Sequence, residues 1–298
     1  MTKVSVIIPT YNRLNSLLKL LVSLKTEVNN TIELLIIEQV INNSHEIKRV
    51  IGKWNSPTTY YLLTEKNFVL ALNFGLSKSK GNFVLYLDDD VIVRKNLIKH
   101  HLNNYADPAV GAVVGRVITK NQKPDLYNFR TARVSILGTV SNGFSSSIRQ
   151  EVDTVIGCNM SWRKTALRNI GGFDKNYTGS AIRNETDASL RIKKLGYIIV
   201  FDPGAEVYHD RAPTGGMRKS EGRIEWYRSF FSNITYFFLM HRPHILFLLY
   251  LLTFWNWFIR CMFGFGREFS SRSMITPVLG IWDGIRKYIN PAKYENRS

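Results

Sequence analysis

Short apolar runs alternate with segments of helical period along the first third of this 298-residue chain. The apolar runs lie at residues 4–9, 32–38, 58–63 and 82–87, and the helical segments at 13–28, 43–54 and 69–78. Strands that alternate with helices form a sheet through right-handed crossovers, which place helices on both of its faces. The alternation therefore predicts an α/β fold with a mostly parallel sheet.

Polar residues follow three of these strands, at 10–12, 38–39 and 88–90. Open α/β sheets bind ligands beyond the carboxyl ends of their strands, so these positions are the first candidates for a site. Asp88 and Asp90 lie two residues apart in an extended segment, and two such carboxylates can face one divalent cation. The alternative is a solvated turn, where aspartate is also common. The place directly after a buried strand favours the metal site.

The second half of the chain is less regular. Residues 109–153 hold strand-like pieces between polar loops, and we expect loops there that face a second substrate, the acceptor. Beyond them the pattern predicts helices at 164–169 and 185–195 and strands at 197–201 and 205–209. Glu185 and Asp187 lie two residues apart at the start of a helix, so their side chains should point in different directions and have different roles.

The chain is strongly basic, with 40 Lys and Arg against 23 Asp and Glu. A net charge of +17 favours phosphate-bearing partners, which include nucleotides, nucleic acids and anionic lipids. The two cysteines, Cys158 and Cys261, match no metal-ligand spacing and indicate a reducing compartment. No signal peptide opens the sequence, and we expect a cytoplasmic protein.

The segment after residue 216 is basic, and aromatic and aliphatic residues dominate positions 236–259. Residues 211–298 contain 13 Lys and Arg against 5 Asp and Glu, and the uncharged run 245–259 is shorter than the ~20 residues of a membrane span. Trp255 and Trp257 suit a lipid headgroup boundary. The basic residues around this run are Arg218, Lys219, Arg223, Arg228, Arg242, Arg260, Arg267 and Arg272. We expect docking on an anionic membrane surface, with a buried helix of a small subdomain or a dimer interface as the alternative.

Several segments, in order, resemble the family-2 glycosyltransferases of the GT-A fold and their bacterial branch that makes cell-surface polysaccharides. The segments are VSVIIPTYNR, GNFVLYLDDDV, IGCNMSWRKTALRNIGGFD, NETDASLRIKKLGY and AEVYHD, with a weaker match in RIEWYRSFFSNITYFFLMHRP. The resemblance implies a catalytic GT-A domain over residues 1–216, which divides into a nucleotide-sugar-binding half (about 1–108) and an acceptor-binding half (about 109–216). Residues 217–298 would form a C-terminal helical region that associates with a membrane or with another copy.

The resemblance also implies a metal site. Asp88 and Asp90 match the Asp-X-Asp pair of the family, with Asp90 the more direct ligand, Asp88 closer to the donor ribose and Asp89 the less essential middle residue. His209, at the end of a short strand, matches a third ligand. An imidazole beside two carboxylates suits Mn²⁺ better than Mg²⁺. The remaining histidines show no acidic partner pattern in the sequence.

The donor and the base are implied in the same way. Thr10, Tyr11 and Glu38 fall where the family holds the base and ribose of the nucleotide, although polar residues at strand ends need no such role. Glu185 matches the catalytic base, but the family's Glu-Asp pair reads Asn184-Glu185 here. Asp187 therefore stays a second candidate for the base.

The implied activity is the inverting transfer of a hexosyl or deoxyhexosyl group from a nucleotide-diphosphate sugar to a glycan or lipid-linked hydroxyl. The enzyme would work on the inner face of the cell membrane. A nucleotidyltransferase would carry a Gly-rich basic loop after the first strand, and none is found. A basic nucleic-acid-binding protein would carry a recognisable motif, and we expect no nucleic acid partner. The loop at 64–75 lacks the family's Asn-X-Gly, so the sugar stays open.

Overall fold

The computed structural model describes residues 3–52, 54, 56–212, 215–216, 221–253, 255, 259 and 271–291. Its first half is a parallel sheet in the order β3-β2-β1-β4. These strands are β1 (Val4–Thr10), β2 (Ile32–Gln39), β3 (Thr58–Leu63) and β4 (Phe83–Leu87). The four strands predicted from the sequence are thus confirmed to within a residue at each end.

The sheet becomes mixed in the second half of the chain. Beyond β4 the order continues as β8-β6-β9-β5, and β7 also pairs with β9. The strands are β5 (Val91–Val93), β6 (Val110–Thr119), β7 (Gln150–Val152), β8 (Asn159–Arg163) and β9 (Ile198–His209). The two strands expected at 197–201 and 205–209 form the single strand β9. A register shift between Gly115 and Arg116 of β6 accommodates the extra residues of β9, so the ladder continues across them.

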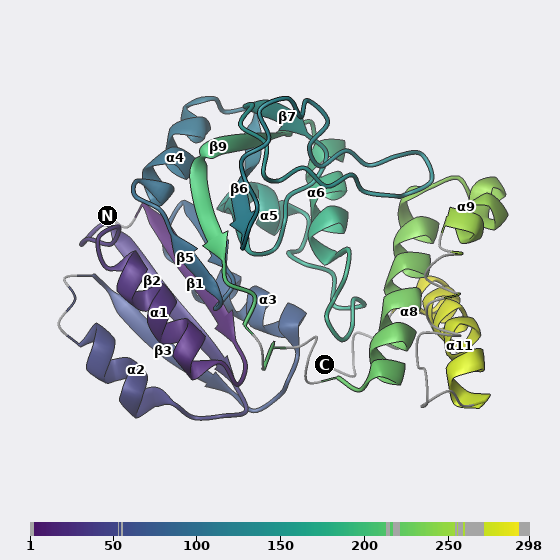
Figure 1. Cartoon of the computed structure of the whole chain (residues 1–298), viewed down its shortest axis with the longest axis horizontal. Helices are drawn as coiled ribbons and strands as arrows, with labels where there is room; N and C mark the ends of the chain where they lie inside the picture. The colour runs from purple at the N-terminus through teal and green to yellow at the C-terminus, as the bar shows by residue number, and fades with distance from the viewer. Residues whose placement is uncertain are drawn as a thin grey trace.

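Helices cover both faces of the sheet, which confirms the α/β class (Figure 1). Val4, Val6 and Ile8 of β1 pack on one face, against α1 (Leu14–Leu24), α2 (Ser44–Ile51) and α4 (Leu97–Asn103). Ile7 of the same strand packs on the other face, against α3 (Phe68–Lys78), α5 (Lys164–Asn169) and α6 (Asn184–Lys194). Successive side chains of a strand point to opposite faces, so an unbroken apolar run is what a sheet buried on both sides requires.

The C-terminal region is helical and lies beside α6 (Figure 1). It contains α8 (Arg223–His241), the short 3₁₀ helix η2 (His244–Leu246), α9 (Phe247–Thr253) and α11 (Ser271–Ile289). Tyr236 and Phe237 of α8 belong to the hydrophobic core under the sheet. At Gly284 of α11 an added Cβ would lie 2.6 Å from the carbonyl oxygen of Ser232, so glycine permits the close packing of α11 on α8.

The structure divides residues 236–259, which were expected at a membrane surface, into a buried part and an exposed part. Tyr236, Phe237 and Phe238 are buried in α8, so these residues are core and the expectation that they face a membrane was wrong. Ile245, Leu248, Leu252 and Trp255 are 90%, 76%, 65% and 56% exposed. None of the helices in the described part of the chain is long and apolar enough to cross a membrane. The expected interfacial residues Arg218, Lys219, Trp257, Arg260 and Arg267 lie outside the described residues.

Candidate functional site

A cavity of about 710 Å³ opens at the carboxyl ends of β1 and β4. Its lining includes the ends of β1 and β2, the acidic triplet after β4, the end of β9 and a loop at 142–145. It therefore lies where an open α/β sheet places its ligands. Thr10, Tyr11, Asp88, Asp89, Asp90 and His209, all predicted for the site, line this one cavity.

Three side chains in the cavity have the arrangement of a metal site. One ligand atom each of Asp88, Asp90 and His209 lies within 4.8 Å of the others. The sheet brings them together, because β5 follows the triplet directly and Val91 pairs with His209 across the antiparallel β5–β9 ladder. Two carboxylates and an imidazole form a donor set that fits Mn²⁺. The residues present therefore fit the divalent cation that the sequence implied.

Asp90 is held in place from several sides. Its Oδ1 lies 3.1 Å from His209 Nε2, and its Oδ2 accepts a hydrogen bond of 3.0 Å from the backbone N–H of Ala212. Arg13 lies 3.0 Å from the same Oδ2. Although burial opposes ionisation, the hydrogen bond and charge of His209 and the charge of Arg13 lower the pKa of Asp90. Asp90 is thereby kept in the charged form that a cation requires.

Asp88 has a different electrostatic environment. Burial, and secondly the charge of Asp90, raise the pKa of Asp88 to about 6, against the opposing charges of His209 and Arg13. Two carboxylates at close range repel each other, and a bound cation would relieve that repulsion. The negative charge of Glu185 also raises the pKa of Asp88. Glu185 is not among the residues that line the cavity, and its role as the base stays a prediction.

The middle residue of the triplet faces β1. The Thr10 hydroxyl donates to Asp89 Oδ2 at 2.7 Å, and Arg13 lies 3.0 Å from Asp89 Oδ1. Asp89 and Thr10 therefore fix each other's side chains. Contact of Thr10 with the nucleotide stays a prediction. Arg13 was missed by the sequence analysis, although it follows the Thr10-Tyr11-Asn12 segment directly and bridges Asp89 and Asp90.

The residues predicted to hold the nucleotide base differ in their access to the cavity. Tyr11 lines the cavity, and Lys66 lies 5.1 Å from the centroid of its ring. The buried Glu38 carboxylate accepts hydrogen bonds from the Tyr60 hydroxyl at 2.7 Å and from the backbone N–H of Asn43 at 2.9 Å. The cavity lining contains the next residue, Gln39, in place of Glu38. Contact of Glu38 with the base stays a prediction.

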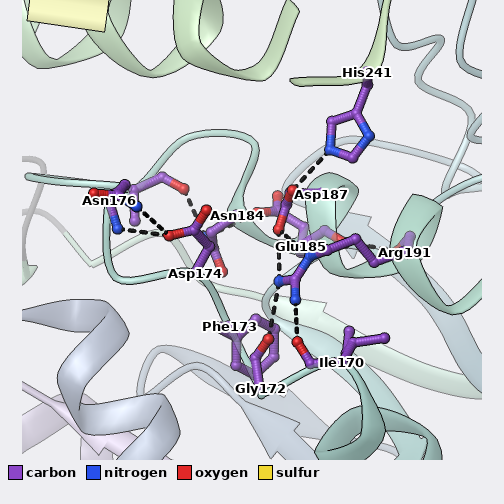
Figure 2. A network of polar contacts seen from close by, with 12 residues as sticks. Ile170, Gly172, Phe173, Asp174, Asn176, Asn184, Glu185, Asp187, Arg191 and His241 are labelled. Atoms are coloured by element: carbon purple, nitrogen blue, oxygen red, sulfur yellow. Dashed lines mark hydrogen bonds and ion pairs between the residues drawn. The ribbon is translucent and has the colours of Figure 1, made fainter. Parts of the chain in front are cut away.

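The two acidic residues at the start of α6 are in different environments (Figure 2). Glu185 is partly exposed and accepts a hydrogen bond of 3.0 Å from Asn184. Asp187 is fully buried, and its two oxygens are bound by Arg191 at 2.6 Å and by His241 at 2.7 Å. The two side chains are thus in different environments, and their separate roles stay a prediction. His241 was missed, because its acidic partner lies 54 residues away in the sequence.

Comparison with known proteins gives a family match over more than half of the chain. The model of the family described as "Glycosyl transferase family 2" matches residues 5–171. The poly-beta-1,6-N-acetyl-D-glucosamine synthase of Staphylococcus aureus is 27% identical over 159 residues, which are 52% of this chain and 37% of that protein. An uncharacterized glycosyltransferase of Rickettsia conorii is 24% identical over 63% of this chain and 34% of that protein. The matches thus span about a third of the length of these relatives.

Solved structures share the fold. Staphylococcus aureus TarS 1–349 in complex with UDP-GlcNAc has a TM-score of 0.66 at 17% identity, over 99% of this chain and 83% of that chain. GalNAc-T7 with UDP, GalNAc and Mn²⁺ has a TM-score of 0.61 at 15% identity, over 80% of this chain and 50% of that chain. The GT-A-like fold predicted from the sequence is confirmed.

Proposed function

Because the chain belongs to glycosyl transferase family 2, we propose that it transfers a sugar from a nucleotide-diphosphate sugar to a hydroxyl of a glycan or lipid-linked acceptor, with inversion at the anomeric carbon. The observation that carries the proposal is the convergence of Asp88, Asp90 and His209 in one cavity at the carboxyl edge of the sheet. The negative charge of Glu185, from a separate element, raises the pKa of Asp88 in that site.

Asp88, Asp90 and His209 would hold a divalent cation, Mn²⁺ by preference. The cation supplies charge stabilisation to the diphosphate when it is bound. Arg13 keeps Asp90 in place, and the Thr10 hydroxyl keeps Asp89 in place, so the triplet is ordered before the donor arrives. Such ordering spares the site a reorganisation at the moment of reaction.

Glu185 is our choice for the general base. The acceptor oxygen forms its bond to the anomeric carbon while the bond from that carbon to the diphosphate oxygen breaks. The proton of the acceptor hydroxyl moves to the Glu185 carboxylate, and the nucleoside diphosphate leaves with the bonding electron pair. Asp187 is a poorer base, because Arg191 and His241 already bind its oxygens away from solvent.

The donor can be identified by binding. Selective ligands raise the melting temperature of the form that they bind. We would measure melting curves with UDP-, GDP-, dTDP- and CMP-sugars, each with and without Mn²⁺, and follow turnover of the sugar that stabilises most. UDP-GlcNAc is the first to test, since TarS binds it and the synthase of Staphylococcus aureus is named for an N-acetylglucosamine polymer. Stabilisation and turnover by none of them would overturn the proposed function.

We further propose that the C-terminal helices rest on the anionic inner face of the cell membrane, where a lipid-linked acceptor is presented. Apolar side chains are exposed on η2 and α9, and also on α11, where Val278 and Trp282 are 59% and 52% exposed. Arg286 lies 5.3 Å from the centroid of the Trp282 ring, so a cation accompanies the aromatic residue. Aromatic side chains with nearby basic residues are typical of surfaces that bind anionic lipid.

Liposome flotation tests the surface directly. The variant with Ile245, Leu248, Leu252 and Trp255 changed to serine should lose flotation with vesicles of phosphatidylglycerol. Val22→Ser, at an exposed apolar residue of α1, is the matched control and should float like the wild type. Equal flotation of both variants would reject docking through this surface. Flotation of neither the variants nor the wild type, together with a dimer in solution, would assign the surface to a second copy.

A further inference from the structure

One face of α8 contacts the segment that leads into α6 and the first turn of α6. Asn233, Tyr236, Phe237 and His241 lie at spacings that put them on a common side of the helix. Each contacts a residue between Asp174 and Asp187. The segment held in this way ends at Glu185 and its neighbours, so α8 is the support on which the proposed base rests.

His241 contacts Asp187, which lies two residues after that base (Figure 2). Its side chain is 2% exposed, and its Nε2 lies 2.7 Å from Asp187 Oδ1. The carboxylate can only accept, so Nε2 carries the proton and donates. Arg191 binds the other oxygen through Nε at 2.8 Å. The Asp187 carboxylate is therefore fixed from two sides, one within α6 and one in α8.

Arg191 extends the same network to the turn before the segment. Its guanidinium donates to the carbonyl oxygen of Ile170 at 2.5 Å and to that of Gly172 at 2.9 Å. Gly172 has a φ of +80°, and an added Cβ would lie 2.6 Å from Asn73 Oδ1 of α3. The turn is thus tied to α3 and α6, and both ends of the segment are fixed.

Further contacts hold the middle of the segment against α8. Asn233 donates to the carbonyl oxygen of Thr178 at 2.8 Å and accepts from its N–H at 3.2 Å, and Lys287 of α11 donates to the Thr178 hydroxyl at 2.9 Å. Arg183, the residue before α6, has a φ of +80°, and its guanidinium lies 5.9 Å from the centroid of the Phe237 ring. The segment is therefore anchored along its length by α8 and α11.

We propose that His241 is a positioning residue, which holds Asp187 and thereby orients the first turn of α6 so that Glu185 faces the metal-binding carboxylates. This inference rests on the proposed function, since it assigns His241 a role through the base. Residues that orient a catalytic group affect rate because small displacements of the reacting groups are costly. An apolar side chain at position 241 would fill the same space but would leave Asp187 without the hydrogen bond from Nε2. Packing alone therefore does not account for a histidine at this position.

Two variants of similar size separate hydrogen bonding from packing. His241→Met fills the space and removes the donor, whereas His241→Gln restores an N–H near the place of Nε2. His244→Ala, at an exposed histidine of the same region, is the control. For each protein we would measure the melting temperature, the binding of UDP with Mn²⁺ by calorimetry, and kcat and KM for the nucleotide sugar that the wild type turns over, all well below the melting temperature.

We expect His241→Met to lower kcat by about 10-fold to 100-fold, with the Kd of UDP and the KM of the donor within about twofold of wild type. His241→Gln should recover most of the lost kcat at the same melting temperature as the methionine variant. A kcat of His241→Met equal to that of an active wild type, whatever its melting temperature, would overturn the positioning role alone. A wild type that turns over no nucleotide sugar would overturn the proposed function and the positioning role with it.

Discussion

Two pairs of acidic residues in this molecule have the same spacing in the sequence but different backbone conformations. Asp88 and Asp90 lie in the turn between β4 and β5, and together with His209 their ligand atoms come within 4.8 Å of one another. Glu185 and Asp187 lie in the first turn of α6, where Glu185 is partly exposed and Asp187 is fully buried. The turn after β4 brings its two carboxylates together, whereas the same separation in a helix turns side chains about 200° apart. The carboxylates of Asp88 and Asp90 (the loop pair) therefore converge where one cation would bind, whereas we assign separate roles to Glu185 and Asp187 (the helical pair).

The largest effect should come from breaking the loop pair. Asp90→Asn keeps the shape and removes a charged ligand, so transfer should fall by at least about 10³-fold and Mn²⁺ should no longer strengthen the binding of UDP. Steady-state kinetics and calorimetry measure the two effects. Asp210→Asn, at a more exposed aspartate near the same site, should leave both unchanged. Turnover of Asp90→Asn at the wild-type rate in a chelator would refute the metal site.

The next effect concerns the exposed member of the helical pair. Glu185→Gln keeps the size and removes the proton acceptor, so kcat should fall by about 10²-fold to 10⁴-fold while UDP still binds with Mn²⁺. Single-turnover kinetics would show whether the loss is in the chemical step. An active Glu185→Gln beside an inactive Asp187→Asn would exchange the roles of the two residues.

The buried member of the pair should act mainly on stability. Asp187→Asn leaves the Arg191 charge without its buried partner, and such losses cost about 3–5 kcal/mol in the free energy of unfolding. We expect kcat at low temperature to fall by about 10-fold to 100-fold, as for His241→Met, which acts through the same carboxylate. Urea unfolding gives the stability, and an unchanged unfolding midpoint would contradict the structural role.

The smallest effect is a pH dependence of the free energy of unfolding. It comes from Lys287, which holds the segment before α6. Burial lowers the pKa of Lys287 to about 7, against the opposing charges of Asp283 on α11 and Asp174 in the loop. Above pH 7 the unfolded chain keeps a proton that the folded chain has lost, so this group makes the free energy of unfolding rise with pH, by at most about 1.4 kcal/mol per unit up to the ordinary lysine range.

Lys287→Met removes that contribution. Urea unfolding of wild type and variant at pH 7, 8 and 9 should therefore give a difference that moves in favour of the wild type as the pH rises. The other titrating groups are common to both proteins and cancel in the difference. A difference that does not change with pH would contradict a lowered pKa of Lys287.

The parallel half of the fold and the metal-binding constellation could be predicted from local patterns. Continuous apolar runs such as 32–38 identify strands buried on both faces, and the triplet at 88–90 directly follows one of them. The partner His209 was found only through the family resemblance. Its nearness depends on the β5–β9 ladder, and no local pattern encodes an antiparallel pairing across so many residues.

The contacts behind α6 could not be predicted, for a related reason. His241 and Asp187 are polar residues in amphipathic or aromatic segments. Each of them, taken alone, is explained as a residue of a solvent-exposed helix face. Their pairing follows from the packing of α8 against α6, which depends on apolar neighbours such as Phe237. The aromatic run of α8 misled for the same reason, since a buried helix and a membrane-facing helix have similar composition.

The hydrogen bond from Lys287 to Thr178 joins residues that are 109 positions apart. During synthesis, β1 and β4 can pair as soon as both have left the ribosome, and the metal-binding triplet follows β4 directly. The segment before α6 has to wait until α11 has also emerged. Contacts of long sequence separation form late because the intervening chain must first be ordered. The acidic triplet therefore reaches its place early in synthesis, and the support behind Glu185 is completed only once α11 has folded onto α8.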